Sequence, residues 1–343
     1  MANKKHTEIS EIGEFGLIDR LTSGIKHQNK TTVMGAGDDA AVIGCGGGKY
    51  KLLTTDLLIE GVDFDLVYFP LKHLGYKAVV RGCSDILAMN GTAEQLTLSL
   101  GISAKFSVEH IEELYEGVTA ACSELGIDLV GGDTSASVNG LVISVSVVGS
   151  VDKTKITYRS GAQVNDLICI TGDLGAAYMG LHLLEREKRA FDGHPSPQPD
   201  FKGREYLLHR QLKPSARKDV IESLAAAGLI PTSMIDLSDG LASDLLQICK
   251  SSGCGARIYL DRLPIARETY AMAEELRADP VVAAINGGDD HELLFTVPLA
   301  MQEKVAKVGG IDIIGHITAS GTGAFLVTPD GSDIPLTAQG ITL

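Results

Sequence analysis

Paired carboxylates beside glycine or serine recur along this chain and are its clearest chemical feature. The first group is Gly35-Ala-Gly-Asp-Asp39, and Thr54-Thr-Asp56 follows shortly after it. Carboxylates held close together repel one another unless a cation lies between them, and hard divalent ions bind carboxylate and hydroxyl oxygens. A solvated acidic turn is the simpler interpretation of any single group. Recurrence favours metal binding, because the pattern returns at Ser84-Asp85, Gly131-Gly-Asp133-Thr134, Asp236-Leu-Ser-Asp239-Gly240 and Gly287-Gly-Asp-Asp290.

Two of these motifs, together with one arginine, suit a phosphate and its metal ions. Asp236 and Asp239 bracket a hydroxyl where a strand leads into a helix, so a phosphate could sit at the helix N-terminus; Asp239 as a simple helix cap, worth ~1 kcal/mol, is the alternative. In Gly131-Gly-Asp133 the glycines would admit a phosphate close to backbone N–H groups, and Asp133 would supply a magnesium oxygen. Arg159 is a candidate phosphate clamp, because its planar guanidinium can pair with two oxygens.

Other familiar phosphate and catalytic motifs are missing from the sequence. The segment Gly44-Cys-Gly-Gly-Gly48-Lys49-Tyr50 is one residue too short for a phosphate loop and lacks its hydroxyl residue, so we interpret it as a hairpin turn. No Gly-x-Gly-x-x-Gly follows a predicted strand, and no Ser-His-Asp or Cys-His arrangement is legible. Phosphoryl transfer depends on positioning and charge neutralisation more than on a covalent nucleophile. The carboxylate groups therefore favour ATP held through several magnesium ions.

Alternating strands and helices are predicted to position these groups, which indicates a mixed α/β chain. A short helix contains Phe15 to Leu21, and Thr54–Asp56 and Gly131–Asp133 are predicted as turns. A clearer helix begins after the Ser107 cap and ends at Gly126. Further helices are predicted at 74–89, 174–189, 215–227, 241–252 and 267–277, and strands at 40–43, 51–55, 57–67, 141–148, 166–171, 256–260, 292–297, 311–317 and 324–328.

Bulk composition narrows the class of protein. A chain of 343 residues is too long for one ordinary core, so we predict two domains, residues 1–150 and 151–343, divided at a polar turn after a strand. A formal charge of −14 argues against a nucleic-acid partner. The six cysteines form no C-x-x-C pair and suit buried thiols in a reducing compartment. With no signal-peptide pattern and no apolar stretch of membrane-spanning length, a cytoplasmic protein without a membrane partner is expected.

Taken in order, the motifs resemble those of the thiamine-monophosphate kinases, in the ATP-binding superfamily that includes aminoimidazole ribonucleotide synthetase. The matching segments span almost the whole chain. They are Gly13-Glu-Phe15, Gly35-Ala-Gly-Asp-Asp39, Thr54-Thr-Asp56, Glu60-Gly-Val-Asp-Phe64, Ser84-Asp85, Gly131-Gly-Asp133-Thr134, Arg159-Ser-Gly161, Asp236-Leu-Ser-Asp239-Gly240-Leu241 and Gly287-Gly-Asp-Asp-His-Glu292.

The resemblance implies an N-terminal domain whose mixed sheet pairs across a homodimer, an α+β C-terminal domain, and a nucleotide cleft between them. It implies transfer of the γ-phosphoryl group of ATP to thiamine monophosphate, giving thiamine diphosphate and ADP. Asp133 and Asp239 would be catalytic, and Asp63 and Asp289 would lie near the acceptor. ATP would contact Gly132, Asp133, Arg159 and Ser238, and magnesium would be bound by Asp39, Thr54, Thr55, Asp56, Asp85, Asp133, Asp236 and Asp239.

Four positions depart from the family pattern, three of them on the acceptor side. The family usually has His at Asp63, Asn at Gly82 and Glu-Asp-Tyr-Glu at Asp289-Asp-His-Glu292, and its C-terminal aromatic residue is missing from 338–343. A carboxylate at Asp63 would repel an acceptor phosphate unless a cation screens it, and His291 is a candidate partner. Two alternatives stay open: the same ATP chemistry on a different small acceptor, and a non-catalytic paralogue that binds nucleotide.

Overall fold

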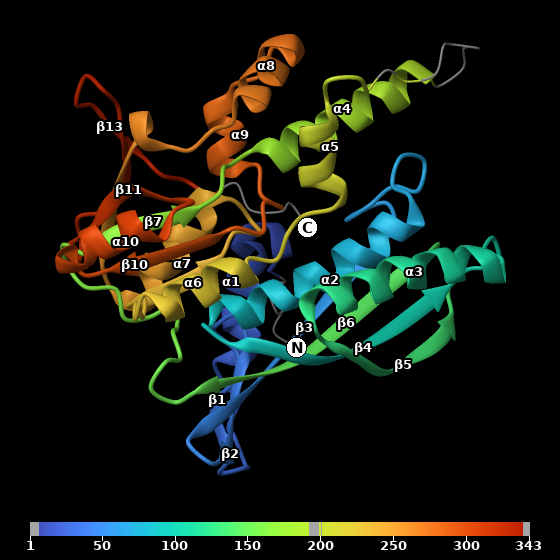
Figure 1. The fold of residues 1–343 in the computed structure, drawn as a ribbon, viewed down its shortest axis with the longest axis horizontal. Helices are drawn as coiled ribbons and strands as arrows, with labels where there is room; N and C mark the ends of the chain where they lie inside the picture. Colours follow the sequence, from blue (N-terminus) through green and yellow to red (C-terminus); the bar gives the residue numbers. More distant parts are fainter. Residues whose placement is uncertain (1–6, 192–198, 200, 339–343) are drawn as a thin grey trace, which may run out of the picture.

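The computed structural model describes residues 7–191, 199 and 201–338. The loop predicted at 192–200 lies outside the described residues except for residue 199, and most of the C-terminal segment 338–343 lies outside them as well. Two mixed sheets and the helices around them form the fold (Figure 1), which confirms the mixed α/β prediction. Within the described residues, no helix is both long enough and apolar enough to cross a membrane.

The first sheet has six strands in the order β1-β2-β3-β6-β4-β5. Only β4 and β5 pair in parallel, and the other neighbours are antiparallel. Its strands are β1 (Thr32–Met34), β2 (Ala41–Gly46), β3 (Lys49–Ile59), β4 (Thr92–Ile102), β5 (Asp128–Ala136) and β6 (Val142–Asp152). The glycines between β2 and β3 form the predicted hairpin turn, with positive φ at Gly46, Gly47 and Gly48. The strand β6 runs through the predicted domain boundary, which stays a prediction.

Two turns predicted from the sequence are wrong. Thr54 and Asp56 lie inside β3, whose residues pair with β6 along its whole length, and the strand ends at Ile59 rather than continuing to Val67. β-branched threonines suit this setting better than they suit a turn. The segment from Gly131 to Asp133 lies inside β5. A Cβ at Gly132 would come within 1.9 Å of the Leu98 carbonyl oxygen, so glycine serves close strand approach here.

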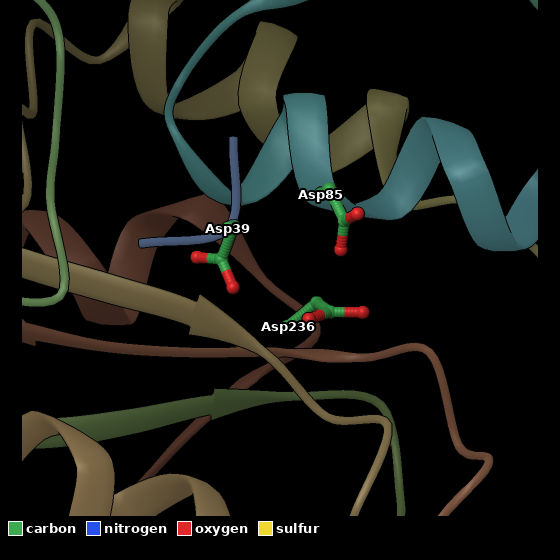
Figure 2. A group of neighbouring side chains, drawn as sticks. All are labelled: Asp39, Asp85 and Asp236. Carbon is green, nitrogen blue, oxygen red and sulfur yellow. The ribbon is translucent and has the colours of Figure 1, made fainter. Parts of the chain in front are cut away.

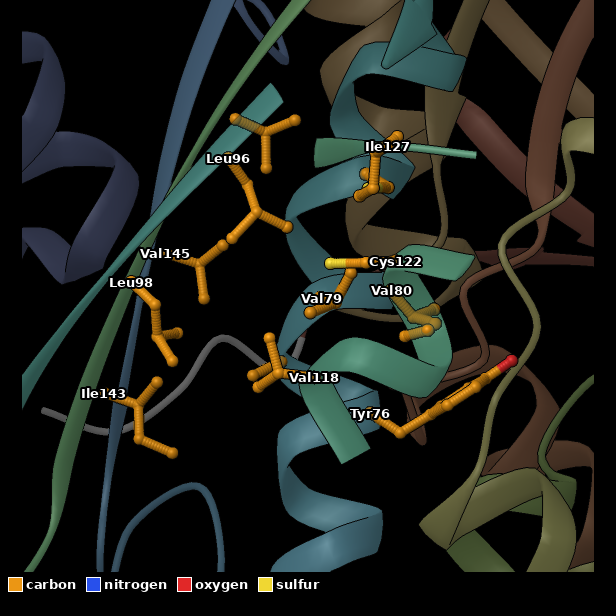
Figure 3. Packing of buried hydrophobic residues seen from close by; sticks show 14 of the residues in the cluster. Tyr76, Val79, Val80, Leu96, Leu98, Val118, Cys122, Ile127, Ile143 and Val145 are labelled. Atoms are coloured by element: carbon orange, nitrogen blue, oxygen red, sulfur yellow. The ribbon is translucent and has the colours of Figure 1, made fainter. Parts of the chain in front are cut away.

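Two helices, α2 (Leu71–Ala88) and α3 (Val108–Leu125), cover one face of this sheet (Figure 1). Alternate strand residues such as Leu98 and Val145 point toward Val79 and Val118 of these helices (Figure 3). The helices touch backbone to backbone, because a Cβ at Gly117 would lie 1.8 Å from the Lys72 carbonyl oxygen. The predicted helix ends at Ser107 and Gly126 are confirmed by a capping box and a left-handed C-cap.

Among the described residues, no such helix pair covers the opposite face of the first sheet, here called the outer face. Along β3, Leu52, Thr54 and Leu58 are buried and Asp56 is half-buried under α2, whereas the residues that alternate with them are exposed. The exposed set is Leu53, Thr55, Leu57 and Ile59, and it lies beside Ser144 and Ser146 of β6. Nearly every residue of the edge strand β5 is also exposed.

The second sheet has seven strands in the order β13-β12-β9-β11-β7-β10-β8. Its strands are β7 (Leu167–Thr171), β8 (Ser233–Asp236), β9 (Gly255–Tyr259), β10 (Leu293–Val297), β11 (Ile311–Thr318), β12 (Ala324–Val327) and β13 (Asp333–Pro335). The helix α7 (Leu241–Ser252) packs on one face, and α6 (Lys218–Ala226) and α10 (Gln302–Val308) pack on the other. Burial on both faces explains why β7, β8 and β10 are entirely buried.

The remaining helices are α1 (Ile9–Thr22), α4 (Ala176–Phe191), α5 (Glu205–Leu212), α8 (Arg267–Leu276) and α9 (Pro280–Asn286). The sequence did not predict α5, α9 or α10, or the strands β1, β4 and β13. The helix α2 joins the two halves of the molecule, because Leu87 and Ala88 at its end pack into the core around α6 and β10. One helix therefore contacts both sheets, and its Ser84 donates a hydrogen bond to Asp236 at the end of β8.

Candidate active site

Three carboxylates from distant parts of the chain meet between the two sheets (Figure 2). Asp39 lies in the loop before β2, Asp85 on α2, and Asp236 at the end of β8. One oxygen of each lies within 4.8 Å of the other two. Thr54 donates a hydrogen bond of 2.5 Å to Asp85 Oδ2, and Ser84 donates one of 2.8 Å to Asp236 Oδ2. These hydroxyls hold the carboxylates in place without adding positive charge.

The electrostatics of this group are those of a site that suits a cation. Burial raises the pKa of Asp236 to about 7, and the Asp39 carboxylate adds to the rise. Burial raises the pKa of Asp39 to about 6, although Arg159 opposes it, and burial with the neighbouring Asp236 carboxylate raises the pKa of Asp85. Asp39 Oδ2 and the nearby Asp56 Oδ2 are buried without a hydrogen-bond partner. Orphaned, mutually repelling carboxylate oxygens fit hard divalent cations such as magnesium.

Arg159 lies on the other side of Asp39. Its Nε and Nη2 both contact Asp39 Oδ1, at 3.1 and 2.5 Å, and its backbone N–H donates to Asp38. Burial raises the pKa of Asp38 to about 6. The predicted clamp is therefore next to the carboxylates, where its guanidinium also neutralises part of their charge.

A pocket of about 280 Å³ adjoins the carboxylate group. Ser238 and Asp239, at the start of α7, form part of its wall. Burial raises the pKa of Asp239, and the Arg81 and Arg159 guanidinium groups oppose that rise. Its lining combines apolar side chains, Leu58, Val62, Phe69, Leu74 and Leu181, with charged or titratable ones, Asp63, Lys77, Arg81, Asp239, Asp289 and His291. Such a pocket suits a small molecule that has both an apolar ring and a charged group.

The two acceptor-side carboxylates each have a defined set of partners. Asp63 accepts from the Ile59 backbone N–H at 2.8 Å and pairs with Arg81 Nη1 at 3.2 Å. The suggested partnership of Asp63 with His291 is wrong, because His291 Nε2 lies 3.0 Å from Asp289 Oδ1 instead. Asp289 also pairs with the buried ammonium of Lys77. Although burial acts to raise it, Lys77 and His291 hold the pKa of Asp289 well below its usual range.

The loop that carries Asp289 and His291 has an unusual backbone. Both residues have positive φ, +62° and +52°, a conformation that costs non-glycine residues of order 1 kcal/mol or more. Backbone hydrogen bonds from Asp289 to the Ser238 carbonyl and from His291 to the Leu237 carbonyl hold it there. The loop is thus fastened to the segment 236–239, which places Asp289 in the pocket wall.

Three predicted site residues are not brought together with the others. Thr55 lies on the outer face, where its hydroxyl accepts from Ser146 at 3.1 Å. Asp133 is also exposed, and its register with Ser99, Ser144 and Leu57 places it three strands from β3, about 14 Å away at about 4.8 Å per strand. Gly132 lies beside it in β5. Within one chain, the sheet separates these residues from Asp39, Asp85 and Asp236.

Three residues of the site, Lys77, Arg81 and Asp244, were not predicted from the sequence. Lys77 and Arg81 precede Asp85 at intervals of four on α2, so the three share one helix face. That four-residue spacing of charges was the available signal. Asp244 on α7 is buried and accepts from the Asp239 backbone N–H at 3.3 Å. No sequence pattern distinguishes Asp244 from a surface residue of an amphipathic helix.

We expect the metal-free protein to lose thermal stability as the pH rises from 5 to 8. In the folded state Asp39 and Asp236 keep their protons up to about pH 6 and about pH 7, whereas in the unfolded chain both carboxyl groups lose them near pH 4. Between these values, a rise in pH therefore stabilises the unfolded chain relative to the folded state. Saturating magnesium should flatten this slope by neutralising the same carboxylates. Thermal unfolding across this pH range, in chelator and in magnesium, measures the difference. Identical slopes in the two conditions would rule out metal binding by this group.

Comparison with known proteins first defines the class. Residues 37–151 match the profile of AIR synthase related protein, N-terminal domain, and residues 163–328 match that of its C-terminal domain. A thiamine-monophosphate kinase of Bacillus subtilis is 31% identical over 95% of this chain and 98% of its own. One of Aquifex aeolicus is 34% identical over 84% of this chain and 87% of its own.

A solved structure described as "AaThiL complexed with AMPPCP and TMP" superimposes with a TM-score of 0.81, at 31% identity, covering 96% of this chain and 97% of the other. The chain therefore belongs to the AIR synthase related family, and within it to the thiamine-monophosphate kinases. The resemblance inferred from the motifs is confirmed.

Proposed function

We infer that this protein is an enzyme that phosphorylates thiamine monophosphate with ATP, giving thiamine diphosphate and ADP. The observation that carries the inference is the group of Asp39, Asp85 and Asp236, close to a pocket whose lining includes Ser238 and Asp239 and combines apolar with charged side chains. Its relatives are named for this reaction, and the similar solved structure contains AMPPCP, an ATP analogue, together with TMP. A pyrimidine and thiazolium body would lie on the apolar wall, with its phosphate toward the carboxylates.

The reaction requires little covalent chemistry from the protein. An oxygen of the acceptor phosphate attacks the γ-phosphorus of ATP, the bond from that phosphorus to the β,γ-bridging oxygen breaks, and ADP leaves with those electrons. Asp39, Asp85 and Asp236, with Thr54 and Asp56 beside them, would hold divalent cations, which neutralise phosphate charge when bound. Arg159 and Ser238 would orient the nucleotide. Asp239 would complete the site from the start of α7.

The alternatives separate in one experiment. Purified protein is incubated with ATP and magnesium in the presence of thiamine monophosphate, of free thiamine, or of no acceptor, and the products are resolved by chromatography. Thiamine diphosphate formed only with the first acceptor supports the proposed function. ATP turnover that does not depend on thiamine monophosphate would indicate a different acceptor. Retained ATP binding with no turnover in any of the three incubations would indicate a non-catalytic paralogue.

We further propose that two chains pair through the outer face and the β5 edge. That face exposes Leu53 and Leu57 at 41% and 51%, and an unpaired edge strand is normally covered or paired. Thr55 and Asp133 lie on the same face, so Asp133 would have to come from the second copy to share an ion with Thr55. Magnesium and a cytoplasmic location remain expectations that accompany this proposal.

The dimer proposal predicts that Leu57→Glu halves the molecular mass measured by light scattering at micromolar concentration. A charge buried in an apolar contact is costly, and the isolated chain should keep its fold because Leu57 is exposed in it. Leu299→Glu, at a similarly exposed leucine outside both sheets, is the matched control and should leave the mass unchanged. A monomeric wild type would contradict the proposal.

A further inference from the structure

Arg81 occupies the boundary between the carboxylate group and the acceptor pocket. Its Nε donates to Asp56 Oδ1 at 3.1 Å, and its Nη1 donates to Asp63 Oδ1 at 3.2 Å. Among the described residues, its Nη2 has no hydrogen-bond partner, so donors of this guanidinium remain available. The side chain is 28% exposed and lines the pocket. Two carboxylates thus fix the plane of the guanidinium while part of its edge faces the cavity.

The other cations near the pocket are already committed. The ammonium of Lys77 is 3% exposed and is shared between Asp289 and the carbonyl oxygen of Gln211. The Arg159 guanidinium donates two hydrogen bonds to Asp39 Oδ1 and is not part of the pocket lining. An acceptor phosphate that enters a site rich in carboxylates needs a cation with free donors to lie against. Among the cationic side chains that line this pocket, Arg81 fulfils that requirement best.

We propose that Arg81 binds the phosphate group of the acceptor and that Asp63 positions its guanidinium, so that this pair determines the preference for a phosphorylated acceptor. The proposal rests on the proposed function for the identity of that acceptor. It also accounts for Asp63: the carboxylate does not face the phosphate unscreened, because its charge is paired with Arg81 and with the Ile59 backbone N–H. The guanidinium fork, held at two points, offers a planar edge to the phosphate oxygens.

The test compares ligands with and without the phosphate on wild type, Arg81→Gln and Arg81→Lys. Calorimetric titration with thiamine monophosphate and with free thiamine measures both affinities. We expect Arg81→Gln to weaken thiamine monophosphate binding by about 10- to 100-fold while changing that of free thiamine less than about threefold. Arg81→Lys keeps the positive charge but lacks the planar guanidinium, and it should weaken thiamine monophosphate binding by about 3- to 10-fold. Arg257→Gln, at a half-exposed arginine paired with Asp333, is the control.

A purely structural role for Arg81 would weaken both ligands equally, and that result, or unchanged affinity for thiamine monophosphate, would overturn the proposal. Turnover of thiamine monophosphate by wild type, measured in parallel, tests the function separately. Selective loss of phosphate-dependent binding without wild-type turnover would support the Arg81 site and refute the function. Normal wild-type turnover together with unchanged affinity of Arg81→Gln for thiamine monophosphate would support the function and refute the Arg81 site. A wild type that binds neither thiamine monophosphate nor free thiamine would refute both proposals.

Discussion

Asp85→Asn and Asp236→Asn are each expected to lower kcat about a thousandfold or more while making the metal-free protein more stable. Each substitution removes one negative charge from the group that would hold cations against the transferring phosphoryl group, a loss of several kcal/mol at the transition state. In the metal-free protein the same charge is destabilising, because burial and neighbouring carboxylates raise the pKa of both residues. An isosteric amide ends that repulsion, and the thermal midpoint in chelator should rise by about 2–4 °C.

The opposite directions of the two effects make the experiment decisive. Steady-state rates in saturating magnesium and thermal unfolding in chelator are measured on the same preparations. Asp312→Asn, an exposed aspartate on β11, is the matched control and should change neither quantity. A variant of Asp85 or Asp236 that keeps more than a tenth of the wild-type kcat would contradict the metal role of that residue. Lower stability in chelator would show that the carboxylate is a structural partner instead.

Glu292→Gln is expected to reduce the free energy of unfolding by about 3 kcal/mol or more. Glu292 is 1% exposed and bridges two arginines, with Oε1 2.6 Å from Arg210 Nη1 and Oε2 2.5 Å from Arg217 Nη1. It also accepts a 2.5 Å hydrogen bond from Thr171. Removing one charge from a buried network leaves the partners uncompensated, and such losses run to about 3–5 kcal/mol. The network anchors α5 and the start of α6 to the loop that carries Asp289 and His291.

The chain offers a matched control for this prediction. Glu275 also bridges two arginines, Arg186 and Arg204, but its side chain is 36% exposed. Solvent screens that network, so Glu275→Gln should cost less than about 1 kcal/mol. Chemical unfolding of both variants, in the absence of magnesium and ligands, measures the difference. Equal and small costs would mean that the Glu292 network contributes little to stability.

The prediction of local structure succeeded where the signal was local. The Ser107 cap, the Gly126 end and the 3.6-residue pattern between them were sufficient to define α3. The same approach failed for Thr54–Asp56 and Gly131–Asp133, where glycine and aspartate suggested turns. Pairing along β3–β6 and β4–β5 outweighed that local preference, since strand formation depends on cross-strand partners distant in the sequence.

By themselves, the order and spacing of the carboxylate motifs determined the family and the mixed α/β class, and they indicated Asp39, Asp85 and Asp236 as candidate metal ligands. Only the tertiary structure decided which side chains share a site. Thr54 and Thr55 are neighbours in sequence, yet the two-residue period of a strand sends one to Asp85 and the other to the outer face. The pairing of Arg81 with Asp63 likewise became visible only in three dimensions. It depends on how α2 packs against β3 and the turn that follows, a long-range arrangement that no local residue pattern records.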